Sequence, residues 1–342
     1  MTTFRIRHRT RYSYDRPVSF GPHRLMLRPR DGHDMRILDS SLILSPAAEV
    51  RWAFDSFGNS VALLTFERAA DELVIESELT VRRYGLDEPL PRIARHAGPY
   101  PVRYDADERI DLAPFRASQF PKERRALEAW LAAALPKRPR ESADLLDRLA
   151  AAVHSGFDYG RREERGVQSP AETIRLGRGT CRDFAVLFME AARFLGFAAR
   201  FVTGYLYDPS ADGDAEAGAE EALTGGGSTH AWADVFIPGV GWIEFDPTNR
   251  IVAGRNLLRV AATRTQTQAL PVSGVCGGED PPPPLPPHAT CSAKGLRNQK
   301  LIMALASNPR GTRLASFGSP PNRTRHAPRR VVEPRPPSPS DG

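Results

Sequence analysis

The stretch GRGTCRDFAVLFMEAARFLGF, residues 177–197, combines a helix start with a cysteine and decides which fold we expect around it. Thr180 is a favourable N-cap residue, and Asp183 stands where a capping box places its acidic partner. Apolar residues then recur at helical spacing, which predicts a helix from Cys181 to just before Gly196. At the first position of a helix, unpaired backbone N–H groups and the positive end of the dipole favour the thiolate over the thiol.

Length and composition indicate a globular protein. The chain has 342 residues, of which 41% are hydrophobic and 26% charged, as is typical of soluble proteins with about two domains. The N-terminal sequence MTTFRIRHRTRYSY has no continuous apolar run, so we expect neither a signal peptide nor a transmembrane helix, and we assign the protein to the cytoplasm. The unrelated spacings of Cys181, Cys276 and Cys291 predict neither a disulfide framework nor a zinc site.

The net charge of +6 comes from the C-terminal tail. Residues 276–342 carry 10 Lys and Arg against 4 Asp and Glu, which leaves 37 of each sign in residues 1–275. The body of the protein is therefore neutral, and its basic isoelectric point does not indicate a nucleic-acid partner. We expect no specific nucleic acid, no membrane and no cofactor, because no metal, nucleotide or flavin motif is present.

The chain divides into four parts. Residues 1–85 contain short runs rich in β-branched and aromatic residues, separated by turn signals, which predict an all-β, sandwich-like N-terminal domain. Residues 86–120 contain several prolines and mixed charge, and we expect a connector with little regular structure. Residues 121–275 contain two amphipathic helices, a short helix over 169–176, and strands. They form the predicted core.

The segment THAWADVFIPGVGWIEFDPTN, residues 229–249, predicts a β-hairpin with a Pro-Gly turn. A five-residue loop over residues 237–241 pairs Trp232 with Asp246. His230 then lies diagonally across from Asp246 on the same face, about 7–8 Å away between backbones, a gap that the two side chains can close. A four-residue loop would place the two on opposite faces.

Cys181, His230 and Asp246 each have a structural interpretation as well. A lone cysteine on an apolar helix face is usually a small core residue, and an Asp before a Pro usually ends a strand in a turn. A histidine within a strand can likewise be structural. Their occurrence together favours catalysis, because a cysteine nucleophile needs a base and that base needs an orienting group. His8, His23 and His33 lack metal-ligand spacing, and we interpret them as solvated or hydrogen-bonded side chains.

The motifs GRGTCRDFAVLFMEAARFLGFAARFVTGYL and HAWADVFIPGVGWIEFDPTN resemble the bacterial transglutaminase-like family, whose core has a papain-like cysteine-protease fold. YDRPVSFGPHRLMLRPRDG and DSFGNSV resemble the N-terminal β-rich region of the same family, so the resemblance covers residues 1–275. It implies an α+β fold, with helices packed on an antiparallel sheet after the β-sandwich domain. It also implies that Cys181 is the nucleophile, His230 the general base and Asp246 the orienting acid.

The chemistry that this resemblance implies is acyl transfer on a peptide or protein amide through a thioester on Cys181. Water or an amine then resolves the thioester, and we slightly favour water. The backbone N–H of Cys181 is the expected oxyanion donor, and Gln168 is a candidate for the second donor. The alternative is a non-catalytic module that keeps the fold and binds a protein or peptide.

The sequence departs from the family pattern at two places. Asp234 stands where the family has a glutamate in its His-Ala-Trp-x-Glu run, which leaves any long-range pairing by that glutamate in doubt. From about Cys276 the resemblance ends, and residues 276–342 contain 14 of the 31 prolines and no periodic apolar pattern beyond LIMALA. We expect this tail to be disordered. An out-of-frame ending is our hypothesis for it, to be tested on the coding DNA, and a genuine basic tail is the alternative.

Overall fold

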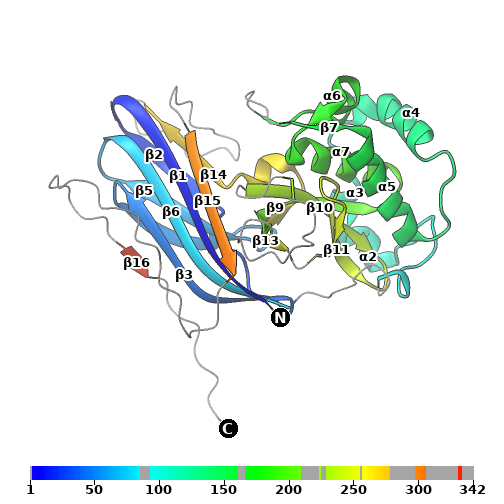
Figure 1. The fold of residues 1–342 in the computed structure, drawn as a ribbon, viewed down its shortest axis with the longest axis horizontal. Coiled ribbons are helices and arrows are strands. Elements are labelled where there is room, and N and C mark those ends of the chain that lie inside the picture. Colours follow the sequence, from blue (N-terminus) through cyan, green and yellow to red (C-terminus); the bar gives the residue numbers. More distant parts are fainter. Residues whose placement is uncertain are drawn as a thin grey trace, which may run out of the picture.

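The computed structural model consists of a β-sandwich and an α+β core (Figure 1). It describes residues 2–84, 93–160, 166–208, 223–224, 229–254, 256–277, 297–305 and 330–332. The α+β fold class is confirmed. Within the described residues, no helix is long and apolar enough to cross a lipid bilayer.

The N-terminal region forms the expected β-sandwich. One sheet contains β1 (Thr2–Val18), β3 (Met35–Ser45) and β6 (Ala70–Arg83), and the other contains β2 (Phe20–Leu25), β4 (Ala48–Phe54) and β5 (Ser60–Phe66). Side chains along β1 alternate between buried and exposed from Phe4 to Tyr12, as an antiparallel sheet with one wet face requires. The two sheets pack face to face, because side chains from both belong to one buried cluster. This cluster includes Tyr12, Phe20 and Leu44.

The core places helices against a five-stranded antiparallel sheet of order β12-β11-β10-β9-β13. Its helices are α4 (Arg124–Ala134), α5 (Ser142–Gly156), α6 (Pro170–Leu176) and α7 (Cys181–Phe194). The strands of the sheet are β9 (Ala198–Leu206), β10 (Thr229–Ile237), β11 (Gly241–Asp246), β12 (Ile251–Val252) and β13 (Leu257–Thr263). The predicted helix start at Cys181 and the predicted short helix with Pro170 in its first turn are confirmed.

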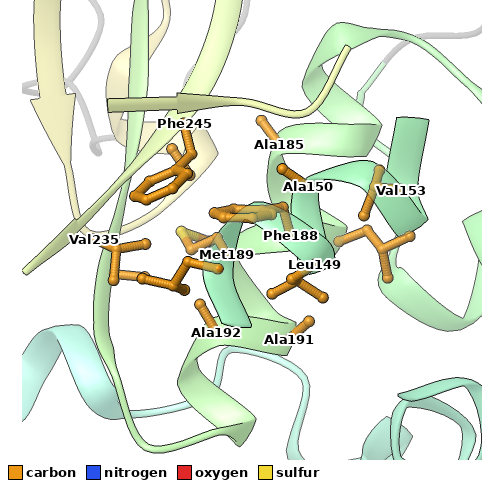
Figure 2. Close-up of a cluster of buried hydrophobic side chains, with 14 of the residues drawn as sticks. Leu149, Ala150, Val153, Ala185, Phe188, Met189, Ala191, Ala192, Val235 and Phe245 are labelled. Atoms are coloured by element: carbon orange, nitrogen blue, oxygen red, sulfur yellow. The ribbon is translucent and has the colours of Figure 1, made fainter. Parts of the chain in front are cut away.

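Helix α7 is the centre of the core. It is buried along almost its whole length, with α5 on one side and the sheet on the other (Figure 2). The ring of Phe188 stacks on that of Phe245 in β11, with 5.5 Å between ring centroids, while Leu149 and Val153 of α5 belong to the same buried cluster. Close packing on both sides fixes the axis of α7, and therefore the position of its first residue.

The hairpin of β10 and β11 has the predicted register. Phe236 pairs with Trp242, and Ala233 pairs with Phe245, so every cross-strand pair has the same sum of residue numbers that the five-residue loop requires. His230 and Asp246 consequently share one face of the sheet. The predicted hairpin register is confirmed.

The connector contains more regular structure than expected. Within residues 93–120, the described part of the connector, α2 (Ala106–Asp111) and α3 (Ala113–Arg116) are short helices, and they are followed by a 3₁₀ turn, η1 (Pro121–Glu123). Asp105 caps α2 by accepting from the N–H of Glu108, whose carboxylate accepts from the N–H of Asp105. The expectation of little regular structure was wrong here, because a local capping box nucleated a helix between prolines.

The C-terminal part of the chain returns to the sandwich. Strand β14 (Val272–Cys276) pairs with β2, so the end of the region assigned to the core belongs to a sandwich sheet. Strands β15 (Arg297–Leu305) and β16 (Arg330–Val332) pair with β1 and β3. Both differ from the expected disorder of 276–342, because open sheet edges offer unpaired backbone groups to any extended segment. The rest of that tail lies outside the described residues.

The cysteines also differ in part from the expectation. Cys181 is a free thiol, whereas Cys276 is disulfide-bonded.

Buried polar contacts join the sandwich to the core. Asn59 uses both ends of its amide on the backbone of Ala262 in β13, accepting from its N–H and donating to its carbonyl, each at 2.9 Å. Arg83 of β6 forms a buried ion pair at 2.8 Å with Glu244 of β11. Because Glu244 lies two residues before Asp246, the sandwich directly supports the strand that carries this candidate residue.

Candidate active site

Cys181 is the first residue of α7, and its neighbour Asp183 organises the helix start. The buried carboxylate of Asp183 accepts from the N–H and the hydroxyl of Thr180 through Oδ2, at 2.8 and 2.9 Å. Its Oδ1 accepts from the N–H of Gln168 at 2.7 Å. One carboxylate therefore ties the helix start to the preceding segment and holds Cys181 in place.

Gly179, two residues before Cys181, has no room for a side chain. β8 (Arg178–Gly179) pairs in parallel with β7 (Asp158–Tyr159) and leads into the helix. A Cβ atom on Gly179 would lie 2.9 Å from Cβ of Asp183 and 3.1 Å from the ring of Phe184. The glycine is needed for this close approach of strand and helix.

The Cys181 thiol is buried, with 8% of the residue exposed. Burial alone would raise its pKa, but the His230 ring and the Arg182 guanidinium more than offset that effect and lower the pKa below the ordinary thiol value. A lowered thiol pKa next to an imidazole is the condition under which a cysteine becomes nucleophilic.

His230 and Asp246 form a buried pair. Nε2 of His230 donates to Oδ2 of Asp246 at 2.8 Å, and both residues are at most 1% exposed. Burial disfavours the imidazolium, yet the charges of Asp246 and Cys181 outweigh it and raise the pKa of His230 to about 10. Among the described residues, Nδ1 of His230 has no hydrogen-bond partner. The Cys181 side chain and the His230 ring lie near enough that each shifts the pKa of the other.

The Asp246 carboxylate is held by three donors. Besides His230, the N–H of Thr248 donates to Oδ1 at 2.9 Å, and Nδ2 of Asn249 donates to Oδ2 at 2.8 Å. Burial would raise the pKa of Asp246, but these donors and the His230 charge keep it below its ordinary value. The contact of Asn249 was not predicted from the sequence, although the Asp-Pro-Thr-Asn motif places its amide three residues after the carboxylate.

Two further residues have defined positions. The side-chain carbonyl of Gln168 accepts from the hydroxyl of Thr173 at 3.0 Å, which turns its amide nitrogen away from that contact. Asp234, the shorter residue in place of the family's glutamate, pairs with Arg200 of β9 at 2.8 Å. The neighbouring strand therefore supplies a cation that the shorter side chain can reach.

Known proteins share both parts of this architecture. Residues 4–82 match the bacterial transglutaminase-like N-terminal region, and residues 130–247 match the transglutaminase-like superfamily. An uncharacterized protein of Mycobacterium tuberculosis is 28% identical over 285 residues, covering 80% of this chain and 87% of the relative. An uncharacterized protein of Mycobacterium leprae is 25% identical over 278 residues, with coverage of 81% and 94%.

The fold recurs in a solved structure. The crystal structure of a candidate cysteine protease from Cytophaga hutchinsonii superposes with a TM-score of 0.64 at 20% sequence identity, covering 93% of this chain and 94% of that one. At this identity the likeness concerns the fold alone. With the two sequence matches in the same order along one chain, the protein belongs to the bacterial transglutaminase-like family.

Proposed function

We propose that the protein is a cysteine-dependent acyltransferase or amidase that acts on a peptide or protein amide. The observation that carries the proposal is the buried series of Cys181, His230 and Asp246, in which a helix-start thiol meets an imidazole held at 2.8 Å by a carboxylate. Sulfur, imidazole and carboxylate in this order are the groups that nucleophilic acyl transfer requires.

In the proposed reaction, the Cys181 thiolate attacks the amide carbonyl carbon while the His230 imidazolium gives its proton to the leaving amine. The C–N bond breaks and a thioester remains on Cys181. Water or a second amine then attacks the thioester, and His230 takes the proton that this nucleophile loses as sulfur leaves. Asp246 keeps the ring oriented and stabilises its charged form in both halves of the reaction.

The negative oxygen formed in each half needs hydrogen-bond donors. We assign the N–H of Cys181, at the helix start, to this role, and the side-chain amide of Gln168 as the second donor. Its carbonyl end is occupied by Thr173, so the amide nitrogen is the end it has to offer. Replacing one such donor lowers kcat by about 100- to 1000-fold in a comparable site, and we expect that range for Gln168→Ala.

Mass spectrometry of a peptide mixture, incubated with and without a primary amine such as ethylamine, tests the function. Free acids or cleaved peptides indicate hydrolysis, which we favour, and ethylamine conjugates indicate amine transfer. Cys181→Ala is the matched control, since it removes only the sulfur. If wild type and Cys181→Ala leave the same peptides unchanged while both bind them, the protein is a binding module and the proposal fails.

We also propose the cytoplasm as the compartment, because a reducing environment preserves the free thiol of Cys181. The disulfide at Cys276 argues instead for an oxidising compartment, in which disulfides persist. Thiol labelling of the protein immediately after lysis of its host decides between them. Labelled Cys276 supports the cytoplasm, and protected Cys276 contradicts it.

A further inference from the structure

The turn that follows Asp246 brings the side-chain amide of Asn249 against the Asp246 carboxylate. β12 doubles back on β11, with Ile251 paired to Asp246, and the reversal is completed by Arg250 in the left-handed region at φ 55°. Asn249 stands immediately before that residue. The tight reversal directs its side chain back over the carboxylate rather than out along the strand.

All three contacts of the Asn249 amide lie on two partners. Nδ2 donates to Oδ2 of Asp246 at 2.8 Å and to the carbonyl of Thr224 at 3.1 Å. Oδ1 accepts from the N–H of Thr224 at 2.8 Å. The side chain therefore pairs with the backbone of Thr224 as a strand would, and the same nitrogen reaches the carboxylate that orients His230.

We propose that Asn249 is a positioning residue that fixes the Asp246 carboxylate against His230, using the backbone of Thr224 as its anchor. The proposal rests on the proposed function, since it assigns Asn249 a role in the Cys181 reaction. Oδ2 of Asp246 receives hydrogen bonds from both His230 and Asn249, and so its direction is set by two donors. A carboxylate with both oxygens engaged cannot rotate away from the imidazole.

The anchor is itself well held. Leu223, next to Thr224, packs against the buried cluster that contains Trp232, two residues after His230 in β10. The hydrogen bonds between Asn249 and Thr224 thus connect the segment before β10 with the turn after β11.

The conformation of the turn does not depend on Asn249 alone. His154 of α5 pairs through Nδ1 with the carbonyl of Thr248 at 2.8 Å, and Arg250 lies 3.5 Å from Asp147. Both contacts hold the turn from its other side and neither touches Asp246. Loss of the Asn249 amide is therefore expected to leave His230 as the one remaining donor of these two to Oδ2 of Asp246, while the turn keeps its backbone path.

The test compares Asn249→Ala and Asn249→Asp with the control Gly156→Ala, whose added methyl group would meet nothing within 4 Å. We expect Asn249→Ala to lower kcat/KM by about 10- to 100-fold, the equivalent of one hydrogen bond to a charged group. Asn249→Asp loses more, because it places a second carboxylate against Asp246. Gly156→Ala keeps wild-type activity.

The pH dependence of Cys181 alkylation by iodoacetamide distinguishes a positioning role from a purely structural one. A purely structural role would leave this dependence unchanged. In Asn249→Ala the rate should rise at higher pH than in wild type, because a loosened Asp246 supports the imidazolium less. In an Asp246→Ala background the same substitution should change nothing further, since Asn249 acts through Asp246.

An unchanged alkylation profile in Asn249→Ala, or an equal shift in both backgrounds, overturns the proposal. Failure of the proposed function gives a different result, because wild-type Cys181 would then titrate like an ordinary thiol. Circular dichroism of each variant confirms that the fold is retained.

Discussion

The reactivity of Cys181 results from a competition at a single sulfur atom. Burial raises the thiol pKa, and His230 and Arg182 lower it by more. We therefore expect the alkylation rate of wild-type Cys181 to rise with pH below the range of a model peptide thiol. In His230→Ala burial persists while the main compensating charge is lost, so the same rise should move above the ordinary thiol range. Iodoacetamide rates across pH measure both profiles.

Arg182→Ala is the control for this measurement, because it removes a cation that lowers the same pKa and leaves His230 in place. Its profile should lie between wild type and His230→Ala. Superimposable profiles for wild type and His230→Ala would contradict the assignment of His230 as the partner of the thiol.

Gly179 gives a second prediction at the scale of one residue. In Gly179→Ala the new methyl group would lie 2.9 Å from Cβ of Asp183 and 3.1 Å from the Phe184 ring, both in the first turn of α7. We expect a loss of about 1–3 kcal/mol in the free energy of unfolding, as for other overpacked sites. Gly156→Ala, at a helix end with nothing within 4 Å, should be neutral or slightly stabilising. Urea denaturation compares the two variants, and equal midpoints would contradict the steric argument.

Among the elements, α7 depends most on packing against the sheet. Phe188→Ala removes a fully buried ring that stacks on Phe245, and we expect it to lower the free energy of unfolding by about 3–5 kcal/mol. Phe194→Ala on the same helix should cost less, because that half-buried ring faces Arg124 at the edge of the core. Thermal and urea unfolding measure which of the two variants loses more stability. A Phe194→Ala loss as large as that of Phe188→Ala would contradict the expectation that α7 depends most on its packing against the sheet.

Local rules predicted the elements that carry the candidate site. Thr180 and Asp183 define where α7 begins, and the length of the hairpin loop settles the face shared by His230 and Asp246. Both depend on residues close in sequence. The helix after Asp105 could also have been predicted, because its capping box was readable, but the surrounding prolines outweighed that signal.

Contacts between distant segments could not be predicted in the same way. Nothing in the residues near Asn249 indicates that Thr224 will lie against its amide, because the chain between them passes through both strands of the hairpin. The same is true of Asn59 on β13 and of β14 beside β2. Such pairings depend on which sheet edges remain unpaired once the other strands have folded. A single sequence does not reveal which edges these are.

For the whole molecule, the junction of sandwich and core predicts a sensitivity to acid. His8 of β1 lies buried against the hydroxyl of Tyr205 in β9, with 3.2 Å between Nδ1 and oxygen, and burial lowers its pKa to about 4. A histidine that is neutral when folded takes up its proton more readily when unfolded. Stability is therefore lost as pH falls below about 6.5, by about 3 kcal/mol once the pH reaches the folded-state pKa.

Urea unfolding at neutral pH and near pH 4.5 measures this loss, and His8→Gln is the control that keeps a polar side chain of similar size. The drop on acidification should be smaller in His8→Gln. His23, whose pKa burial also lowers, is present in both proteins and contributes equally to each. Identical drops would show that the junction histidine is not the titrating group.

The return of β14 and β15 to the sandwich has a consequence for biosynthesis. β1 and β2 leave the ribosome first, but their outer neighbours are translated only after the whole core. Until then, both nascent strands present bare edges to the crowded cell, which is the state most prone to intermolecular pairing.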